Sequence, residues 1–263
     1  MLVVNKMKLF KELYLYRELL KTNIKKEIRG KYKGSFLGVL WSFVNPLLMV
    51  LVYAIVFPFI LRVKEDNYLI FLIVATIPWT FFTTCISHGT TTVLANGGLI
   101  KKVYFPRAIL PISVVTSALI NFLISCIIIF VFLLFSGIGF SMYIFLLPIV
   151  IIIEYILALS IVFILSAINV YIRDVEYIMN FVIMMLFYAT PILYTFDLIP
   201  SKIKLIFNLN PMAHIINAYR DILYYQQLPD LLNLVIVGIA SIILLLIGYK
   251  IFRKLEKGFA EEV

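Results

Sequence analysis

Apolar stretches without any charged residue alternate with short polar segments along the chain. About 20 apolar residues suffice for a helix to cross a hydrocarbon layer about 30 Å thick, and runs this long without alternating polarity favour helices over a barrel. The pattern predicts six transmembrane helices: residues 36–61, 68 to about 92, 108 to a break at 136–139, from that break to about 168, 177–194 and 231–249. The break reads Ser-Gly-Ile-Gly and interrupts a charge-free stretch from 108 to 153.

The positions of lysine and arginine predict the orientation of these helices. With both termini in the cytoplasm, 18 of the 23 basic residues lie on the cytoplasmic side, as the positive-inside rule favours. The net charge of +9 does not indicate a nucleic acid partner, because the basic residues flank apolar spans and are not interleaved with exposed aromatics. We expect a multi-pass protein of the bacterial inner membrane, in contact with membrane lipids.

The composition also indicates a membrane protein. Hydrophobic residues make up 63% of the 263 residues and charged residues only 14%, against roughly 25% charged in a typical soluble domain. A bilayer solvates this much apolar surface, whereas a single soluble core could not bury it. We predict one all-α transmembrane domain over 1–263, made of a cytoplasmic helix and elbow (1–34), the six-span region (35–252) and a cytoplasmic tail (253–263).

The N-terminal segment 7–29 has the pattern of an amphipathic helix. Its apolar residues recur on one helical face, whereas its lysines and arginine lie elsewhere; this face consists of Leu9, Leu13, Tyr16, Leu20, Ile24 and Ile28. We predict an interface helix on the cytoplasmic membrane surface. The alternative is a basic tail that only fixes topology.

The cytoplasmic loop 93–107 is predicted to contain a short helix. Asn96-Gly97-Gly98 interrupts the preceding helix and Pro106 closes the loop before the third span. A helix over 99–105 fits between these two breaks.

The external segment 196–229 is too apolar for a solvated loop. Asn210 is expected to cap a helix that Pro211 starts. A preceding helix from 200 to about 208 would complete an external re-entrant helical hairpin that dips into the outer leaflet.

The residues offer no catalytic chemistry. No Gly-x-x-x-x-Gly-Lys-Ser/Thr loop occurs, and no carboxylate pair, Ser-His-Asp arrangement or metal-ligand spacing is present. We predict no catalytic, cofactor-binding or metal site in this chain. Glu154 is the one acid in the middle of a predicted span, where a charge costs at least about 2.5 kcal/mol. A structural or interface role is the preferred interpretation, with lining of a substrate path and proton coupling as alternatives.

Four segments carry a resemblance to a known family. In chain order they read RGKYKGSFLGVLWSFVNPLL, IPWTFFTTCISHGTTTVLANGGLIKKVYFPRAILP, INVYIRDVEYIMNFV and NLNPMAHIINAYRDIL. Together with the six-span pattern, they resemble the permease subunits of bacterial ABC exporters for O-antigen, capsule and teichoic acid. The resemblance covers nearly the whole chain.

The resemblance implies a dimer of this chain joined to two separate ATPase subunits, which would bind ATP and Mg. It also implies that the loop 93–107 holds a coupling helix seated in a groove of the ATPase, formed by Leu99, Ile100, Lys101, Lys102, Val103, Tyr104, Phe105, Pro106 and Arg107. Arg173 and Asp174 would form a second cytoplasmic contact, and the external hairpin would be the gate. On charge alone, the basic residues of the loop are also explained as topology anchors.

Aromatic side chains in two spans are candidates for a glycan path, because rings can stack on the apolar faces of sugars. The candidates are Trp79, Phe81 and Phe82 in the second span and Phe187, Tyr188 and Tyr194 in the fifth. A lipid-facing aromatic belt is the alternative interpretation.

These observations predict the transmembrane subunit of an ATP-driven exporter of polysaccharide or lipid-linked glycan. A permease for drugs or other small molecules would share the topology. A polyprenyl-lipid transferase should show acidic metal-binding clusters near the cytoplasmic face, where only Asp174 and Glu176 occur. A non-catalytic assembly scaffold is a further alternative.

Overall fold

The computed structural model describes residues 11–32, 34, 36–61, 67–202 and 204–263, and within these ranges all regular structure is helical. The α-helices are α2 (Arg17–Tyr32), α3 (Trp41–Leu61), α4 (Tyr68–Ala95), α5 (Gly97–Lys102), α6 (Ile109–Phe135), α7 (Leu147–Tyr171), α8 (Asp174–Tyr188), α9 (Lys204–Asn208), α10 (Pro211–Leu223), α11 (Leu231–Leu255) and α12 (Phe259–Glu262). Short 3-10 helices cover Gly38–Leu40, Met142–Leu146, Phe196–Leu198 and Glu256–Gly258. The prediction of an all-α protein is confirmed for the described residues.

Four helical segments of the described chain are long and apolar enough to cross a membrane. They are Tyr68–Lys102, Ile109–Phe135, Met142–Tyr171 and Leu231–Glu262. The predicted first span corresponds to α3, in which the described apolar segment is the shorter Val44–Phe57. The predicted fifth span corresponds to α8, which has 15 residues and a length of about 23 Å. The structure therefore supports four of the six predicted spans by length.

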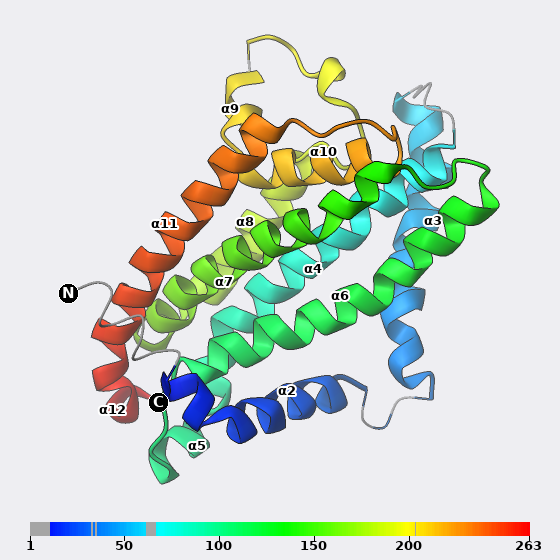
Figure 1. Cartoon of the computed structure of the whole chain (residues 1–263). Helices are drawn as coiled ribbons and strands as arrows, with labels where there is room; N and C mark the ends of the chain where they lie inside the picture. The colour runs from blue at the N-terminus through cyan, green and yellow to red at the C-terminus, as the bar shows by residue number, and fades with distance from the viewer. Residues whose placement is uncertain (1–10, 33, 35, 62–66, 203) are drawn as a thin grey trace.

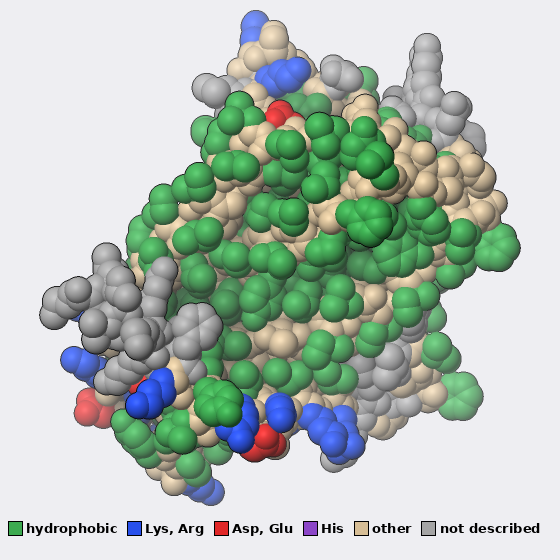
Figure 2. Space-filling model, viewed as in Figure 1, with side chains coloured by type: hydrophobic (Ala, Val, Ile, Leu, Met, Phe, Trp, Pro, Cys, Tyr) green, Lys and Arg blue, Asp and Glu red, His purple; other side chains and the backbone are tan. Residues whose placement is uncertain are grey.

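Helix α4 lies at the centre of the bundle and packs against α3, α6, α7, α8 and α10. Helices α7 and α11 approach closely at Gly248, where a Cβ atom would lie 2.6 Å from the backbone oxygen of Ser160. The absence of a side chain at Gly248 thus permits this approach. Figure 2 shows hydrophobic side chains covering the face formed by α6, α7 and α11, with lysines and arginines gathered at the end where α2 and α12 lie.

The described part of the N-terminal amphipathic segment, residues 11–29, is interrupted by a turn, whereas one continuous helix was predicted for 7–29. Residues 11–15 are helical, Tyr16 lies in a turn, and α2 starts at Arg17. The predicted apolar face is nevertheless the side that packs inward, since Leu13, Tyr16 and Leu20 contact the hydrophobic core and α2 lies along α6. Leu9, the first residue of that face, lies outside the described residues.

The predicted break between the third and fourth spans is confirmed. Gly137 and Gly139 have φ angles of 77° and 73°, in the left-handed region that favours glycine. The chain reverses direction there, and α7 follows the short 3-10 helix.

The segment 196–229, which was predicted to be external, contains α9 and α10. The side chain of Asn210 accepts a hydrogen bond from the Met212 backbone N–H at 3.0 Å, and Pro211 is the first residue of α10. Both features of the predicted helix start are therefore confirmed. Helix α9 begins at Lys204, later than predicted. Figure 1 shows α9 and α10 at the end of the bundle opposite α2, α5 and α12.

Candidate functional site

The predicted coupling segment contains a shorter and earlier helix than expected. Helix α5 runs over Gly97–Lys102, and Val103 has extended backbone angles of −133° and 135°. The prediction of a helix over 99–105 was wrong at both ends, because the helix starts at Gly97 and ends at Lys102. Helical angles are disfavoured in the residue before a proline, and the stretch 103–105 that leads into Pro106 is not helical.

Four exposed side chains, at 101–104, lie between two buried ones in this segment. Lys101 and Lys102 are exposed, and Tyr104 is 93% exposed. Ile100 and Phe105 are buried in the core of this chain. The surface that the segment presents outward therefore combines two cations with one large aromatic ring.

The C-terminal residues of the chain support α5 from one side. Val263 lies against Gly97, at the position that a side chain there would occupy. The Arg107 Nη1 atom donates to the backbone oxygen of Glu256, and its guanidinium carbon lies 5.9 Å from the centre of the Phe259 ring. Sequence analysis assigned Arg107 to the ATPase, whereas the structure directs its side chain to the C-terminal segment of the same chain.

Polar contacts from the N-terminal helices support the same region. Lys26 Nζ donates to Asn96 Oδ1 at 2.9 Å, which joins α2 to the residue preceding α5. Arg253 pairs with Glu256 at 2.7 Å and with Glu12 at 3.7 Å. These contacts join α2 to the residue before α5, and the helical residues 11–15 to the end of α11.

Arg173 and Asp174 lie at the start of α8 and are exposed. The turn that holds them is attached to the end of α11, because Tyr171 Oη donates to the Leu255 backbone oxygen at 2.8 Å. Tyr171 also lies near Phe259 of α12, with ring centres 6.3 Å apart. The predicted second contact thus lies at the same end of the molecule as α12, which packs on α5.

The structure brings three of the six candidate path aromatics into one cluster between α3, α4 and α8. The Trp79 ring centre lies 5.9 Å from that of Phe82 and 6.0 Å from that of Phe187. Tyr53 of α3 joins them at 5.8 Å from Phe187. Tyr53 was not among the predicted path residues. The sequence of an apolar span does not distinguish a tyrosine that packs in an aromatic cluster from one that faces lipid.

The other three candidates lie outside this cluster or at its edge. Phe81 faces α6 and stacks on Phe122 with ring centres 5.0 Å apart. Tyr188 lies 5.4 Å from Phe187 but is 64% exposed. Tyr194 lies beyond the end of α8 and donates to the Tyr188 backbone oxygen at 2.5 Å.

Glu154 is fully buried in α7, as expected for an acid that faces the bundle interior. Tyr219 of α10 donates its hydroxyl hydrogen to Glu154 Oε2 at 2.7 Å. The acid thus connects the long apolar helix α7 to α10. This contact favours the structural role among the three interpretations of Glu154.

Arg220 is a buried cation that sequence analysis counted only as an external basic residue. It is 2% exposed, and its guanidinium group donates to the backbone oxygens of Pro191, Ile192 and Tyr194, the last two at 2.6 and 3.3 Å. The guanidinium carbon also lies 3.5 Å from the centre of the Phe71 ring. Arg220 therefore holds the turn after α8 against α10 and α4.

A sequence signal for this burial existed. Arg220 follows Tyr219 and lies four residues after Ile216, so it falls at the edge of the apolar face of α10. A basic residue at such an edge can either extend to solvent or bind backbone carbonyls, and the sequence does not say which carbonyls are near.

Comparisons with known proteins agree with this arrangement. The family model described as ABC-2 type transporter matches residues 18–224. The O-antigen export system permease protein RfbA of Myxococcus xanthus is 36% identical over 258 residues, which is 97% of this chain and 99% of the relative. Two proteins of the same description from Klebsiella pneumoniae are each 36% identical over 249 residues, 94% of this chain and 95% of each relative. With a family match over most of its length and relatives of this similarity, the chain belongs to the ABC-2 type transporter family.

Proposed function

We propose that this chain is the membrane-spanning subunit of an ATP-driven exporter that moves polysaccharide or lipid-linked glycan across the bacterial inner membrane. The observation that carries the proposal is 36% identity over nearly the full length of O-antigen export permease proteins. The same observation favours glycan over drugs or other small molecules as the cargo. No phosphate-binding loop occurs in the sequence, so ATP and Mg are assigned to two separate ATPase subunits.

The proposed topology keeps six spans, with α3 and α8 as the first and fifth. Both termini lie in the cytoplasm, α2 lies at the inner membrane surface, and α9 with α10 forms the external re-entrant hairpin and gate. Support comes from the arrangement in Figure 1, where α2, α5 and α12 share one end of the bundle and α9 and α10 the other. The excess of lysine and arginine at the first of these ends fits the cytoplasmic side.

A second copy of this chain is the proposed partner within the membrane. All residues of α8 are described and none of them is buried. Apolar side chains that are each more than half exposed form a stripe at helical spacing: Tyr177, Ile178, Phe181, Met184, Met185 and Tyr188. A dimer would cover this stripe and place the Trp79–Phe187 cluster behind its contact surface.

The proposed coupling contact involves fewer residues than the sequence predicted. Lys101, Lys102 and Tyr104 extend outward and would contact the ATPase. Arg107 would act indirectly, by holding α5 to the C-terminal segment. When the ATPase subunits close, a push on α5 would reach α2 through Lys26 and Asn96.

Deletion of the gene in the source bacterium tests the proposed function. Surface glycan should be lost, lipid-linked glycan should accumulate on the cytoplasmic side, and a plasmid copy should reverse both changes. Unchanged surface glycan, together with altered resistance to drugs, would instead identify the small-molecule exporter. A stable complex whose ATPase activity does not change when glycan is added would instead support the non-catalytic assembly scaffold.

Reversing the charge of the two α5 lysines should show whether they bind the ATPase or only fix the membrane topology. In Lys101→Glu/Lys102→Glu, copurification of the ATPase should fall about tenfold or more, because docking depends on local charge complementarity. The matched control is Lys21→Glu/Lys25→Glu, which makes the same charge change on exposed residues of α2 and should leave copurification within twofold. Equal losses in both variants would show that the α5 lysines act only as topology anchors.

Cysteine labelling tests the orientation directly. The natural Cys85 and Cys126 are buried, so an impermeant maleimide should give little background. Lys202→Cys should be labelled in intact spheroplasts, and Lys102→Cys only after permeabilisation. The opposite pattern would invert the topology and remove α5 from the cytoplasm.

A further inference from the structure

Residues 256–263 form a short helical segment that follows α11. Its helix α12 packs on both α5 and α7. In the described chain, α5 packs chiefly on α12 and on the end of α4 that directly precedes it. A force applied to α5 therefore acts first on α12 and on the end of α4.

Two glycines allow the segment 256–263 to approach its neighbours closely. Gly97 of α5 lies against Val263, whose Cγ1 atom occupies the position that a side chain at 97 would take. Gly258 lies against the end of α7, where an added Cβ atom would be 2.5 Å from the Oη atom of Tyr171. A side chain at either glycine would push the segment away from its neighbour. These two contacts thus join α5 to the end of α7 through one segment.

A buried aromatic ring anchors the segment. Phe259 is fully buried, and its ring centre lies 5.4 Å from that of Phe252 in α11 and 6.3 Å from that of Tyr171. The Arg107 guanidinium group lies over the same ring and donates to the Glu256 backbone oxygen. Phe259 therefore packs with side chains of α7, of α11 and of the residue that leads into α6.

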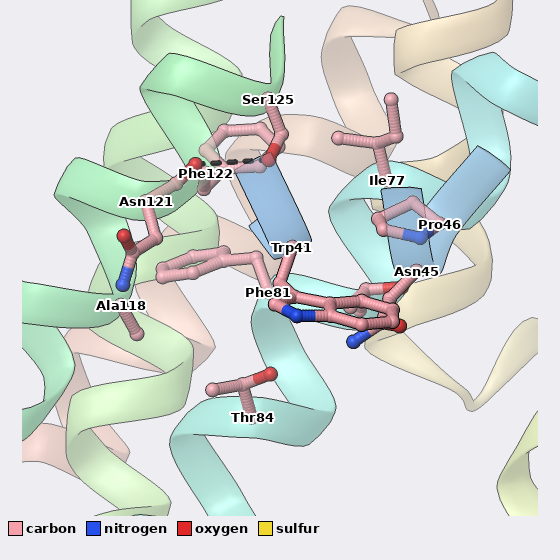
Figure 3. Close-up of a pocket in the computed structure, with 11 residues that line it drawn as sticks. Trp41, Asn45, Pro46, Ile77, Phe81, Thr84, Ala118, Asn121, Phe122 and Ser125 are labelled. Carbon is pink, nitrogen blue, oxygen red and sulfur yellow. Dashed lines mark hydrogen bonds between the residues drawn. The ribbon is translucent and has the colours of Figure 1, made fainter. Parts of the chain in front are cut away.

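Packing is looser between α3 and its neighbours. A cavity of about 180 Å³ lies between α3, α4 and α6 (Figure 3), with Trp41 of α3 and Asn121 of α6 among the residues that line it. Closely packed interiors transmit displacement, whereas a void gives a helix room to shift. Movement that arrives through residues 256–263 would accordingly be passed on along α7 and α11 and taken up where α3 meets α4 and α6.

We propose that residues 256–263 are a mechanical link of the exporter, which holds α5 and the turn before α8 as one rigid unit and passes movement of the ATPase to α7 and α11. The proposal rests on the proposed function. Coupling between separate sites is carried by packed side chains and hydrogen bonds, and the segment supplies both. Gly97 and Phe259 are positioning residues of this link. Loss of the contact at Gly97 uncouples transport from ATP hydrolysis without releasing the ATPase.

Adding one methyl group to α5 tests the contact. In Gly97→Ala, expressed from a plasmid in the deletion strain, surface glycan should fall at least fivefold, because the new Cβ atom displaces Val263. Copurification of the ATPase and ATP hydrolysis by the purified complex should stay within twofold of wild type. The matched control is Gly98→Ala, which makes the same change in the same helix where the described chain leaves open space around an added Cβ atom. It should keep all three quantities within twofold.

Two results of this experiment would overturn the proposal. One is an equal loss of surface glycan in Gly97→Ala and Gly98→Ala, because the contact with Val263 would then have no special role. The other is a loss of copurification in Gly97→Ala that parallels the loss of surface glycan, because the segment would then support docking and not transmission.

A second substitution should restore the fit. Val263→Ala removes the methyl groups that the added Cβ atom at Gly97 would displace. The double variant Gly97→Ala/Val263→Ala should therefore return surface glycan to within twofold of wild type. A general loss of stability would give the opposite result, since Val263→Ala also removes packing contacts and would add to the defect. A double variant as defective as Gly97→Ala would contradict the proposal.

A disulfide tests whether α5 and the segment move together. The Val263 Cβ atom lies 3.4 Å from the position of a Cβ atom at Gly97, close to the separation of about 3.5–4.5 Å found in disulfides. Gly97→Cys/Val263→Cys should form this bond on mild oxidation, while the natural Cys85 and Cys126 are buried. In inside-out vesicles that contain the complex, ATP-driven uptake of glycan should agree within twofold before and after oxidation. Failure to form the disulfide, or a loss of uptake that a thiol reductant reverses, would overturn the proposal.

Failure of this inference is distinguishable from failure of the proposed function. If deletion of the gene abolishes surface glycan but Gly97→Ala restores it to the wild-type level, the exporter stands and residues 256–263 are not its link. If deletion leaves surface glycan unchanged, the proposed function itself fails and the link proposal fails with it.

Discussion

Replacing Arg220 by methionine should strongly destabilise the packing of α10 against the turn after α8. The buried guanidinium group donates to the backbone oxygens of Pro191, Ile192 and Tyr194, and methionine offers no donor. Each buried acceptor left without a donor costs about 1–3 kcal/mol, so we expect a loss on the order of 3 kcal/mol or more. At this chain length that corresponds to a fall in melting temperature of about 5–10 °C, measured on protein purified in detergent.

Two further substitutions make this result specific. Arg220→Lys keeps the charge, but an ammonium group cannot reproduce the planar set of donors, so its melting temperature should lie between those of wild type and Arg220→Met. Arg173→Met removes an exposed arginine and should change the melting temperature by about 1 °C or less, as surface substitutions usually do. A wild-type melting temperature for Arg220→Met would mean that Arg220 does not hold the turn after α8.

Replacing Glu154 by alanine should also destabilise the protein strongly, whereas glutamine should be tolerated. Alanine leaves the buried Tyr219 hydroxyl without its acceptor and opens a cavity, with an expected cost of about 2–4 kcal/mol. Glutamine retains an oxygen that can accept the same hydrogen bond and nearly the same volume. We therefore expect Glu154→Gln to export glycan at close to the wild-type rate.

The pair of Glu154 variants distinguishes the interpretations of this acid. Export and melting temperature should both fall in Glu154→Ala, and both should stay close to the wild-type values in Glu154→Gln. Loss of export in Glu154→Gln at an unchanged melting temperature would show that the carboxyl group itself is required, as proton coupling demands. Tyr219→Phe, which removes only the donor, should have a smaller effect than Glu154→Ala.

Features set by local sequence were predictable. The helix start at Asn210-Pro211 and the break at Gly137 and Gly139 depend on capping and on backbone angles that particular residues favour. Apolar residues also recur at helical spacing in α10, and two of them, Ile215 and Ile216, are fully buried. Such signals act within one or two turns of a helix, so a single sequence contains them.

Features set by contacts between distant segments were not predictable. The turn at Tyr16 has no glycine or proline to mark it, and the preceding helical residues are joined to α11 through Glu12 and Arg253. Arg107 was assigned to the ATPase from the resemblance, and the sequence does not reveal that the backbone oxygen of Glu256 lies beside it.

ATP-driven uptake of glycan into inside-out membrane vesicles tests the central claim most directly. Vesicles containing this chain and its ATPase would be supplied with lipid-linked glycan on the exposed cytoplasmic face, and glycan protected from an added glycosidase would be measured. We predict protection that requires ATP and this chain and that falls about tenfold in Lys101→Glu/Lys102→Glu but not in Lys21→Glu/Lys25→Glu. Protection of the same extent in vesicles lacking this chain, or no protection with ATP when both proteins are present, would contradict the account.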